Sequence, residues 1–274
     1  MHTALKHHID RLYQRRSELD PKSSAETGLI SQAIDLLDSG QARVAEIVDG
    51  EVVVHEWLKR AILLYFQTQP NVATELGPFE IVDKVPLKTG LQQAQVRALP
   101  GSIARWGSFI EPNTILMPSF VNIGARVGAG TMVDTWATVG SCAQIGRNVH
   151  LSGGVGIGGV LEPPQAAPVI VEDNAFIGSR SMVTEGARVG EGAMLGAGVI
   201  LNPSIPVIDA ETGDEVSRGV VPPWCLVINA TRAREFRGGT FGIACALIIK
   251  RFSPGERHDK AALNEVLRTY GTGL

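Results

Sequence analysis

The sequence has few aromatic residues and few cysteines for its length. Phe, Trp and Tyr make up 5% of the 274 residues, and the three cysteines, Cys142, Cys225 and Cys245, lie far apart without a C-x-x-C pair. An odd number of dispersed cysteines supports neither a disulfide framework nor a zinc knuckle. We therefore expect a core of aliphatic and small side chains.

The sequence also lacks an excess of basic residues and any long apolar run. Lys and Arg total 25 against 28 Asp and Glu, so the electrostatic footprint of a nucleic-acid-binding protein is missing. No run of 18 apolar residues occurs, and the first 20 residues are charged throughout, without the apolar stretch of a signal peptide. We expect a soluble, cytoplasmic protein with neither a nucleic-acid nor a membrane partner.

What is abundant is glycine, together with a periodic arrangement of aliphatic residues. Glycine accounts for 31 residues, and the 44% of hydrophobic residues is enough for a real core, which excludes a disordered chain. An apolar residue recurs at every sixth position in two blocks that are offset by two residues. The first block is Ile103, Phe109, Ile115, Val121, Val127, Val133, Val139, Ile145, Leu151 and Ile157, and the second is Val171, Ile177, Val183, Val189, Leu195, Leu201 and Val207.

A second slot of the same repeat carries small residues. Four positions after the apolar residue come Ala125, Thr131, Ala137, Ala143, Ala175, Ser181, Ala187 and Ala193. A period of six fits neither an α-helix nor an uninterrupted strand, but it fits a parallel β-helix in which three hexads form one triangular coil. Aliphatic and small side chains then fill a prism too narrow for aromatic rings. The two blocks predict five to six coils, with a loop inserted at residues 161–168.

The segments on either side of the repeat are expected to form separate parts. We predict a mostly helical domain over residues 1–100, the β-helix over 101–208 and a small β/α extension over 209–274 that caps the open strands. The expected elements are helices at 24–40 and within 52–67, a hairpin at 44–57, β segments at 218–230 and 241–252, and a closing helix at 259–271.

Three motifs inside the repeat favour structural interpretations. GGVGIGG at 153–159 contains G-x-G-x-x-G, but the hexad register continues through it and no helix pattern follows, which argues against a dinucleotide-binding turn. His150 is the only histidine of the repeat, so no metal site is expected, and a structural role is favoured over a catalytic one. Cys142 is interpreted as a packing residue and not as a nucleophile.

Acidic residues are the more informative exceptions to the pattern. Asp134 follows Val133 in a slot that elsewhere in the first block carries Ala, Ile, Leu, Asn, Gly or Ser, and a carboxylate at a coil corner is an unusual choice for packing. A solvated corner is the alternative. Glu172 occupies the same slot of the second block and is interpreted as a solvated turn. Glu185 lies one position later in its hexad and is a candidate proton acceptor.

Residues 131–181, TMVDTWATVGSCAQIGRNVHLSGGVGIGGVLEPPQAAPVIVEDNAFIGSRS, resemble the tetrahydrodipicolinate N-succinyltransferase family of hexapeptide-repeat acyltransferases. The likeness extends to MPSFVNIGARV, LLDSGQARVAE, DKVPLK and LNEVLRTY, and so covers most of the chain. The resemblance implies a left-handed β-helix, and it implies homotrimers with active sites between subunits. The implied reaction moves a succinyl group from succinyl-CoA, a co-substrate, to the amine of tetrahydrodipicolinate, with no permanently bound cofactor and no covalent acyl-enzyme.

The resemblance also assigns roles to particular residues. The family's substrate-binding arginine falls on Arg97 in VRALP, and its acidic substrate-contacting residue falls on Asp134 in MVDTW. One departure concerns S-E-V-x-E-G, a motif frequent in the family, because Met182 stands where its first glutamate is expected. Glu185 is then the substitute candidate for a catalytic carboxylate.

The CoA-binding residues follow from the shape of such a groove. Gly178 and Gly196 are candidates for a floor under the pantetheine arm. Lys250 and Arg251 are candidates for contacts with the CoA phosphates, with a solvated basic pair as the alternative.

Two other functions remain open from the sequence. One is another hexapeptide-repeat O- or N-acetyltransferase, which an inactive His150→Ala variant would favour because such enzymes commonly rely on a histidine of the repeat. The other is a non-catalytic scaffold, which failure to bind CoA would favour.

Overall fold

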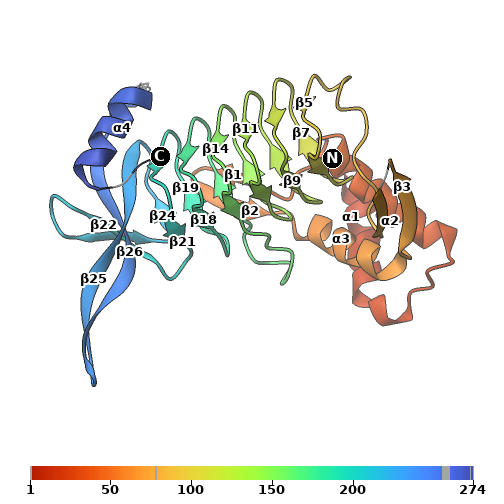
Figure 1. The fold of residues 1–274 in the computed structure, drawn as a ribbon. Helices are drawn as coiled ribbons and strands as arrows, with labels where there is room; N and C mark the ends of the chain where they lie inside the picture. Colours follow the sequence, from red (N-terminus) through yellow and green to blue (C-terminus); the bar gives the residue numbers. More distant parts are fainter. Residues whose placement is uncertain (1, 78, 255–259, 272, 274) are drawn as a thin grey trace.

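The computed structural model describes residues 2–77, 79–254, 260–271 and 273. Helices gather at the N-terminal end, a ladder of short strands forms the middle, and a long hairpin and one helix stand at the C-terminal end (Figure 1). In the described part of the chain, no helix is long and apolar enough to cross a bilayer.

The N-terminal part is a small helical domain with two hairpins. Its helices are α1 (Thr3–Gln14), the 3-10 turn η1 (Arg16–Glu18), α2 (Ser24–Asp38) and α3 (Glu56–Thr68). The hairpins pair β1 (Ala45–Val48) with β2 (Glu51–Val54), and β3 (Val72–Leu76) with β4 (Phe79–Asp83). The expected helices and the expected β1–β2 hairpin are confirmed. The N-cap of α2 is Ser23, whose hydroxyl accepts a hydrogen bond from the Glu26 amide.

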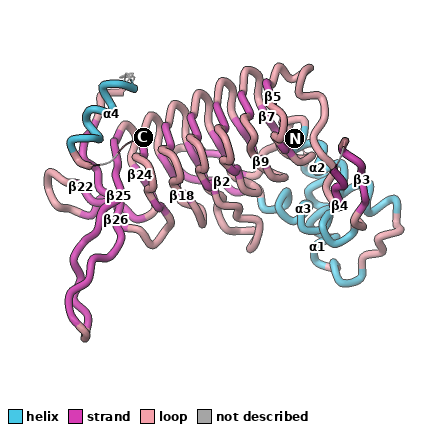
Figure 2. Tube along the Cα trace, viewed as in Figure 1, coloured by secondary structure: helices cyan, strands magenta, loops and turns pink. Residues whose placement is uncertain are grey.

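Three parallel sheets form the faces of a triangular prism, as the repeat predicts (Figure 2). The first face contains β6 (Ile103–Ala104), β9 (Phe120–Val121), β12 (Thr138–Val139), β15 (Gly156–Ile157), β18 (Met182–Val183) and β21 (Ile200–Leu201). The second contains β7 (Phe109–Ile110), β10 (Arg126–Val127), β13 (Gln144–Ile145), β16 (Ile170–Val171), β19 (Arg188–Val189) and β24 (Val220–Val221). The third contains β5 (Arg97–Ala98), β8 (Ile115–Leu116), β11 (Met132–Val133), β14 (His150–Leu151), β17 (Phe176–Ile177), β20 (Met194–Leu195) and the start of β25 (Cys225–Phe236).

The interior of the prism is packed with the residues of the two periodic slots, with one correction. The repeat predicts that Ile103, Phe109 and Ile115 point inward. In the structure the next residue of each strand points inward instead; in β8, for example, Leu116 is buried and Ile115 faces outward. The reason is a shorter corner, because Leu116 and Val121 are five positions apart instead of six. Side chains alternate along a strand, so one missing residue exchanges the inward and outward sets. From Val121 onward the expected register holds.

The end of the second block also departs from the prediction. Val207 is buried, but it lies on β22 (Pro206–Asp209), which pairs with β23 (Glu215–Arg218) and β26 (Gly239–Arg251) and not with the next coil. This excursion closes at Gly219, where an added Cβ would lie 2.6 Å from the Cα of Pro203. The coil then resumes in β24 and the start of β25, so β-helix strands continue beyond residue 208.

The C-terminal segments extend the third face. β25 and β26 form a long antiparallel hairpin that projects from the body of the molecule (Figure 1). Helix α4 (Lys260–Thr269) matches the expected closing helix, whose first residue, Asp259, lies outside the described residues. Leu267 of α4 is buried in one cluster with Met194 and Leu226, so the helix packs on the outer surface of the third face.

Candidate active site

The outward side chains of the third face form one continuous row. Strand pairing places them in the order Arg97, Ile115, Met132, His150, Phe176, Met194, Leu226 and Lys250. Neighbouring strands are about 4.8 Å apart. Two of the residues expected to bind substrates, Arg97 and Lys250, therefore lie toward opposite ends of the same row.

Asp134 stands at the corner where the third face turns into the first. Its amide donates to the Leu151 carbonyl, and in the following coils Ser152, Gly178 and Gly196 make the equivalent hydrogen bonds. These four residues form a column that we call the Asp134 edge. The structure thus brings together Asp134, Gly178 and Gly196, which were expected to serve different parts of one reaction.

Small residues along the Asp134 edge have a packing reason of their own. An added Cβ on Gly178 would lie 2.5 Å from the Leu195 carbonyl oxygen, so the stacking of coils requires glycine there. At Gly196 the nearest atoms are 3.5 Å away, and the neighbouring Ala197 amide donates to the carbonyl of Gly273 at 2.9 Å. Gly273 therefore lies at this edge.

The carboxylate of Asp134 is held in one orientation. Its Oδ1 accepts hydrogen bonds from the Thr135 amide at 2.6 Å and from the Thr135 hydroxyl at 3.2 Å. Its Oδ2 lies 3.7 Å from Nε2 of His150 on the next coil. The imidazole of His150 stacks on the ring of Phe176, with centroids 5.1 Å apart and planes inclined by 14°. The side chains of Asp134 and His150 are 30% and 24% exposed.

Sequence reasoning missed this pairing and undervalued Trp136. One coil is 18 residues long, as from Val133 to Leu151, so a residue 16 positions after Asp134 comes to lie beside it. Trp136 is 74% exposed on the same corner and adopts a φ of 60°, in a slot that the next coil fills with Gly154. A tryptophan at a position where the next coil has glycine could have been noticed from the repeat pattern of the sequence, without the structure.

The cations expected to bind CoA differ in their engagement. The ammonium of Lys250 lies 5.2 Å from the Phe252 ring centroid, at the end of the outward row. Arg251 instead donates to Asp209 Oδ2 at 2.8 Å, and this hydrogen bond lowers the pKa of the Asp209 carboxyl. Arg251 is thus committed to an ion pair within the fold.

Glu185 lies on a different edge of the prism. It stands between β18 and β19, where the first face turns into the second, and it is exposed with a φ of 56°. Next to it, an added Cβ on Gly186 would meet the Ala167 carbonyl oxygen, so the loop over 161–168 runs beside this edge. Within one chain, Asp134 and Glu185 are not brought together.

The edge that carries Glu185 also carries Cys142, and there the helical domain packs. Cys142 and Ile123 belong to the same buried cluster as α2 and α3. Burial raises the pKa of the Cys142 thiol to about 12, so it is not a thiolate nucleophile at neutral pH. The structural interpretation of Cys142 agrees with this burial.

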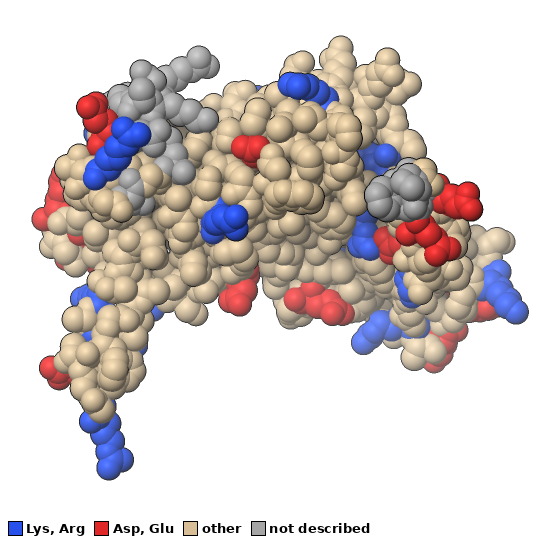
Figure 3. Space-filling view, viewed as in Figure 1, with Lys and Arg blue, Asp and Glu red and all other residues tan. Residues whose placement is uncertain are grey.

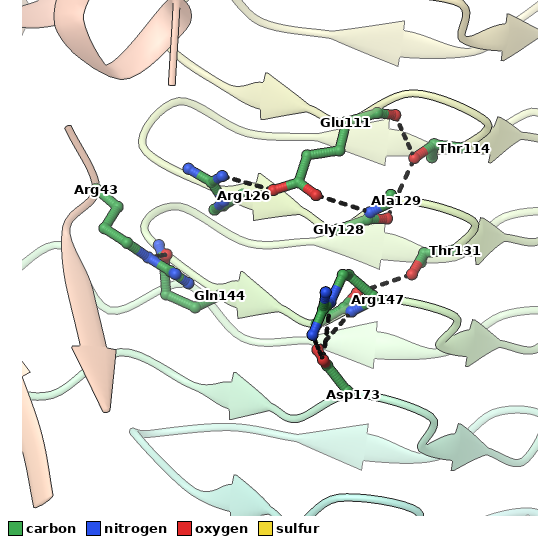
Figure 4. A network of polar contacts seen from close by, with 11 residues as sticks. Arg43, Glu111, Thr114, Arg126, Gly128, Ala129, Thr131, Gln144, Arg147 and Asp173 are labelled. Atoms are coloured by element: carbon green, nitrogen blue, oxygen red, sulfur yellow. Dashed lines mark hydrogen bonds and ion pairs between the residues drawn. The ribbon is translucent and has the colours of Figure 1, made fainter. Parts of the chain in front are cut away.

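A separate polar network covers the second face (Figure 4). Arg126 donates to Glu111 at 2.5 Å, Arg147 donates to Asp173 at 2.7 Å, and Arg43 donates to Gln144 at 3.2 Å. A pocket of about 400 Å³ lies between β1 and this face. Glu172, expected to be a solvated turn, belongs here and accepts from Arg188 at 2.5 Å. Arg126, Arg147 and Arg188 are paired with acids of the same fold, and Arg43 is paired with the amide of Gln144, so the network is structural.

In the view of Figure 3, few charged side chains lie over the middle of the β-helix, and more of them lie over the helical domain. A triangular prism of six-residue repeats is the architecture of hexapeptide-repeat proteins. Accordingly, residues 168–203 match the model of the hexapeptide repeat of succinyl-transferases.

The comparisons with known proteins narrow this class to one family. Residues 4–68 match the model of the tetrahydrodipicolinate N-succinyltransferase N-terminal domain. The chain is 49% identical over 267 residues, 95% of its length and 97% of the relative's, to 2,3,4,5-tetrahydropyridine-2,6-dicarboxylate N-succinyltransferase of Dechloromonas aromatica. It is 47% identical to the protein of that name from Methylorubrum extorquens, over 98% of this chain and 99% of the relative. The chain belongs to the 2,3,4,5-tetrahydropyridine-2,6-dicarboxylate N-succinyltransferase family.

A solved structure supports the fold. A chain from Campylobacter jejuni, described as a candidate 2,3,4,5-tetrahydropyridine-2-carboxylate N-succinyltransferase, aligns with a TM-score of 0.50 and 19% identity, over 80% of this chain and 62% of that one. The expected class, a left-handed parallel β-helix with a helical N-terminal part and a C-terminal β/α part, is confirmed.

Proposed function

We propose that this protein transfers the succinyl group of succinyl-CoA to the amine of tetrahydrodipicolinate, in its hydrated or ring-opened form. The products are N-succinyl-2-amino-6-oxopimelate and CoA, a step of lysine and diaminopimelate biosynthesis. The observation that carries the proposal is identity of 46–49% over nearly the whole chain to relatives named for this reaction. Such a reaction draws on cytoplasmic CoA thioesters, so we place the protein in the cytoplasm.

The chemistry needs little from the protein beyond alignment and proton transfer. A thioester is already activated, so a positioned amine attacks it directly, given a proton acceptor and donors for the developing oxyanion. No covalent acyl-enzyme is required. The buried thiol of Cys142 is consistent with direct transfer, because it offers no accessible nucleophile.

Arg97 and Asp134 divide the recognition of the acceptor. Arg97 lies on β5, two strands along the third face from β11, and hence about 10 Å from the strand that precedes Asp134. A guanidinium at this separation can pair in fork geometry with one carboxylate of a seven-carbon diacid while Asp134 contacts its amine. The carboxylate of Asp134 then holds or deprotonates the attacking ammonium.

The acyl donor is assigned to the remainder of the same face. The pantetheine arm follows the Asp134 edge over Gly178 and Gly196, and the ammonium of Lys250 meets the CoA phosphates. Arg251 takes no part in this assignment because Asp209 already engages it.

The site requires a neighbouring subunit. Asp134 stands on an outer edge of the prism, next to His150 of the third face, and Glu185 of the same chain lies on another edge. We assign the assembly to a homotrimer whose active sites lie between subunits, so that Glu185 of one chain faces Asp134 of the next.

The decisive test is an assay of CoA release. Release must depend on both succinyl-CoA and tetrahydrodipicolinate. No turnover with tetrahydrodipicolinate, together with turnover of a sugar or serine acceptor, would contradict the proposal and favour an acetyltransferase. Failure to bind CoA in calorimetry would favour a scaffold. Because His150 lies beside Asp134, an inactive His150 variant no longer separates succinyl from acetyl transfer, and acceptor and donor specificity must do so.

A further inference from the structure

A buried lysine of the helical domain holds the loop that is inserted into the β-helix at residues 161–168. Lys59 of α3 is 0% exposed. Its ammonium donates one hydrogen bond to the Pro163 carbonyl at 3.1 Å and another to the Ala166 carbonyl at 2.7 Å. The Pro163 carbonyl also accepts from the Ala166 amide at 3.0 Å. Lys59 therefore binds both ends of one turn in the loop.

Packing alone does not account for a lysine at this position. Its neighbours Leu58 and Ile62 on α3 belong to an apolar cluster, where a leucine or methionine would fill space equally well. Burial lowers the pKa of the Lys59 ammonium, so keeping the charge here costs free energy. The two acceptors are main-chain carbonyls and not carboxylates. What the lysine adds is a fixed position for the turn at 163–166.

The loop passes this position on to the turn that carries Glu185. On one side of the bound turn, Leu161 packs against the apolar cluster of the helical domain. On the other side, the Ala167 carbonyl lies against Gly186, where an added Cβ would be 2.5 Å from its oxygen. Glu185 and Gly186 both have positive φ, 56° and 79°. The loop is therefore a bridge between α3 and the Glu185 turn.

This bridge lies beside the proposed intersubunit site. The loop leaves the β-helix after β15, at the end of the first face, and Glu185 stands at the same edge one coil later. The proposed trimer places Glu185 opposite Asp134 of the next subunit. A misplacement of about 1 Å can lower a rate by about 100-fold, so the support of this carboxylate has consequences for turnover.

We propose that Lys59 is a positioning residue of the acyl transfer, which fixes the loop at 161–168 and through it the placement of Glu185 against the active site of the next subunit. This inference rests on the proposed function and on its intersubunit site. Lys59 is buried and contacts no substrate, so its whole effect passes through the loop. The helical domain then serves the reaction as a support for one wall of the site.

Lys59→Met tests the proposal, because it removes the ammonium and keeps an unbranched side chain for the apolar surroundings. We expect kcat to fall by about 10–100-fold, with KM for succinyl-CoA within about threefold of wild type. The matched control is Lys84→Met. Lys84 also donates to a main-chain carbonyl, that of Phe66 at 2.6 Å, but this hydrogen bond lies within the helical domain, so kcat should be unchanged.

A double-mutant cycle separates positioning from a general loss of stability. If Lys59 acts through Glu185, Lys59→Met should change the residual kcat of Glu185→Gln by less than about twofold, because that residual activity no longer uses the carboxylate. Mixed trimers add a second readout. Lys59→Met subunits should recover activity with Asp134→Asn subunits but not with Glu185→Gln subunits, since Lys59 and Glu185 act from the same chain.

Leu161→Ala removes the other anchor of the loop and leaves Lys59 in place, so it carries the test if Lys59→Met does not fold. It should lower kcat in the same non-additive way. Normal turnover in these loop variants or in Glu185→Gln, or losses that multiply fully in the cycle, would overturn the inference and leave the succinyltransferase assignment intact. A wild-type protein inactive with tetrahydrodipicolinate would contradict both.

Discussion

At the scale of single residues, the proposed function rests on side chains that break the repeat. The repeat fills corners with small residues, and Asp134 and Trp136 are exceptions on one corner of one coil. The side chains of Asp134 and Trp136 take no part in the core of the prism, so they are available for chemistry. Arg97 and His150 occupy outward positions of strands, so their side chains also lie outside the core.

Asp134→Asn tests the central residue. The amide keeps the size of the side chain and accepts the Thr135 hydrogen bonds through its oxygen, but it loses the negative charge that holds the ammonium. We expect turnover to fall by about 10² or more, with an unchanged circular dichroism spectrum. Near-normal activity would remove Asp134 from the mechanism.

Arg97→Ala tests acceptor recognition. Loss of a charge-assisted hydrogen-bonded pair with a substrate carboxylate is worth about 1.5–3 kcal/mol, so KM for tetrahydrodipicolinate should rise by roughly 10–100-fold while KM for succinyl-CoA stays constant. Arg147→Ala is the control, since Arg147 is paired with Asp173 on the second face. An equal rise of both KM values would argue against a specific contact.

At the scale of elements, coil stacking depends on glycine where backbones touch. An added Cβ on Gly140 would lie 2.2 Å from the Gly159 amide nitrogen of the next coil, and neither backbone can withdraw without breaking the ladder. Gly28 has no such role. Gly28 lies inside α2 with no atom within 4 Å of an added Cβ.

These two glycines give a matched pair of variants. Gly140→Ala should lower the free energy of unfolding by about 3 kcal/mol or more, because overpacking forces the coils apart. Gly28→Ala should raise it by about 0.5–1 kcal/mol, since it removes the entropic cost of glycine in a helix. Chemical denaturation measures both, and a neutral Gly140→Ala variant would show that the coils can separate without cost.

At the scale of the whole molecule, the separation of Asp134 and Glu185 on two edges is the strongest structural reason to expect an oligomer. A rotationally symmetric ring brings one edge of a subunit to a different edge of its neighbour. Two residues that are apart in one chain can then share a site.

Mixed trimers test this arrangement. Asp134→Asn and Glu185→Gln variants are each expected to be inactive alone, but trimers assembled from a mixture contain sites with both native residues. With random 1:1 assembly, about one quarter of the sites are of this kind, so activity should recover to roughly that fraction. No recovery, or a catalytically active monomer in light scattering, would contradict intersubunit sites.

Most of the architecture followed from periodicity alone. Six residues per side, with an aliphatic and a small residue in fixed slots, permit few structures besides a triangular β-helix, because both residues must point inward on every side of every coil. The error of register before Val121 has a simple cause. Both residues of β8 and of β9 are apolar, so the sequence does not reveal that the step from Leu116 to Val121 is five residues and not six.

The sequence by itself determined the β-helix, the family and the exceptional position of Asp134. Only the tertiary structure decided that His150 lies 3.7 Å from Asp134, that Arg251 is committed to Asp209, and that Glu185 lies on another edge. The physical reason is that a repeat fixes which side chains point inward by local alternation, whereas outward neighbours are set by the stacking of coils 18 residues apart, by the inserted loop and by the excursion at 206–218. The few aromatic residues illustrate the division, because the narrow core excludes them, whereas Phe176 and Trp136 lie on the outer surface near His150 and Asp134.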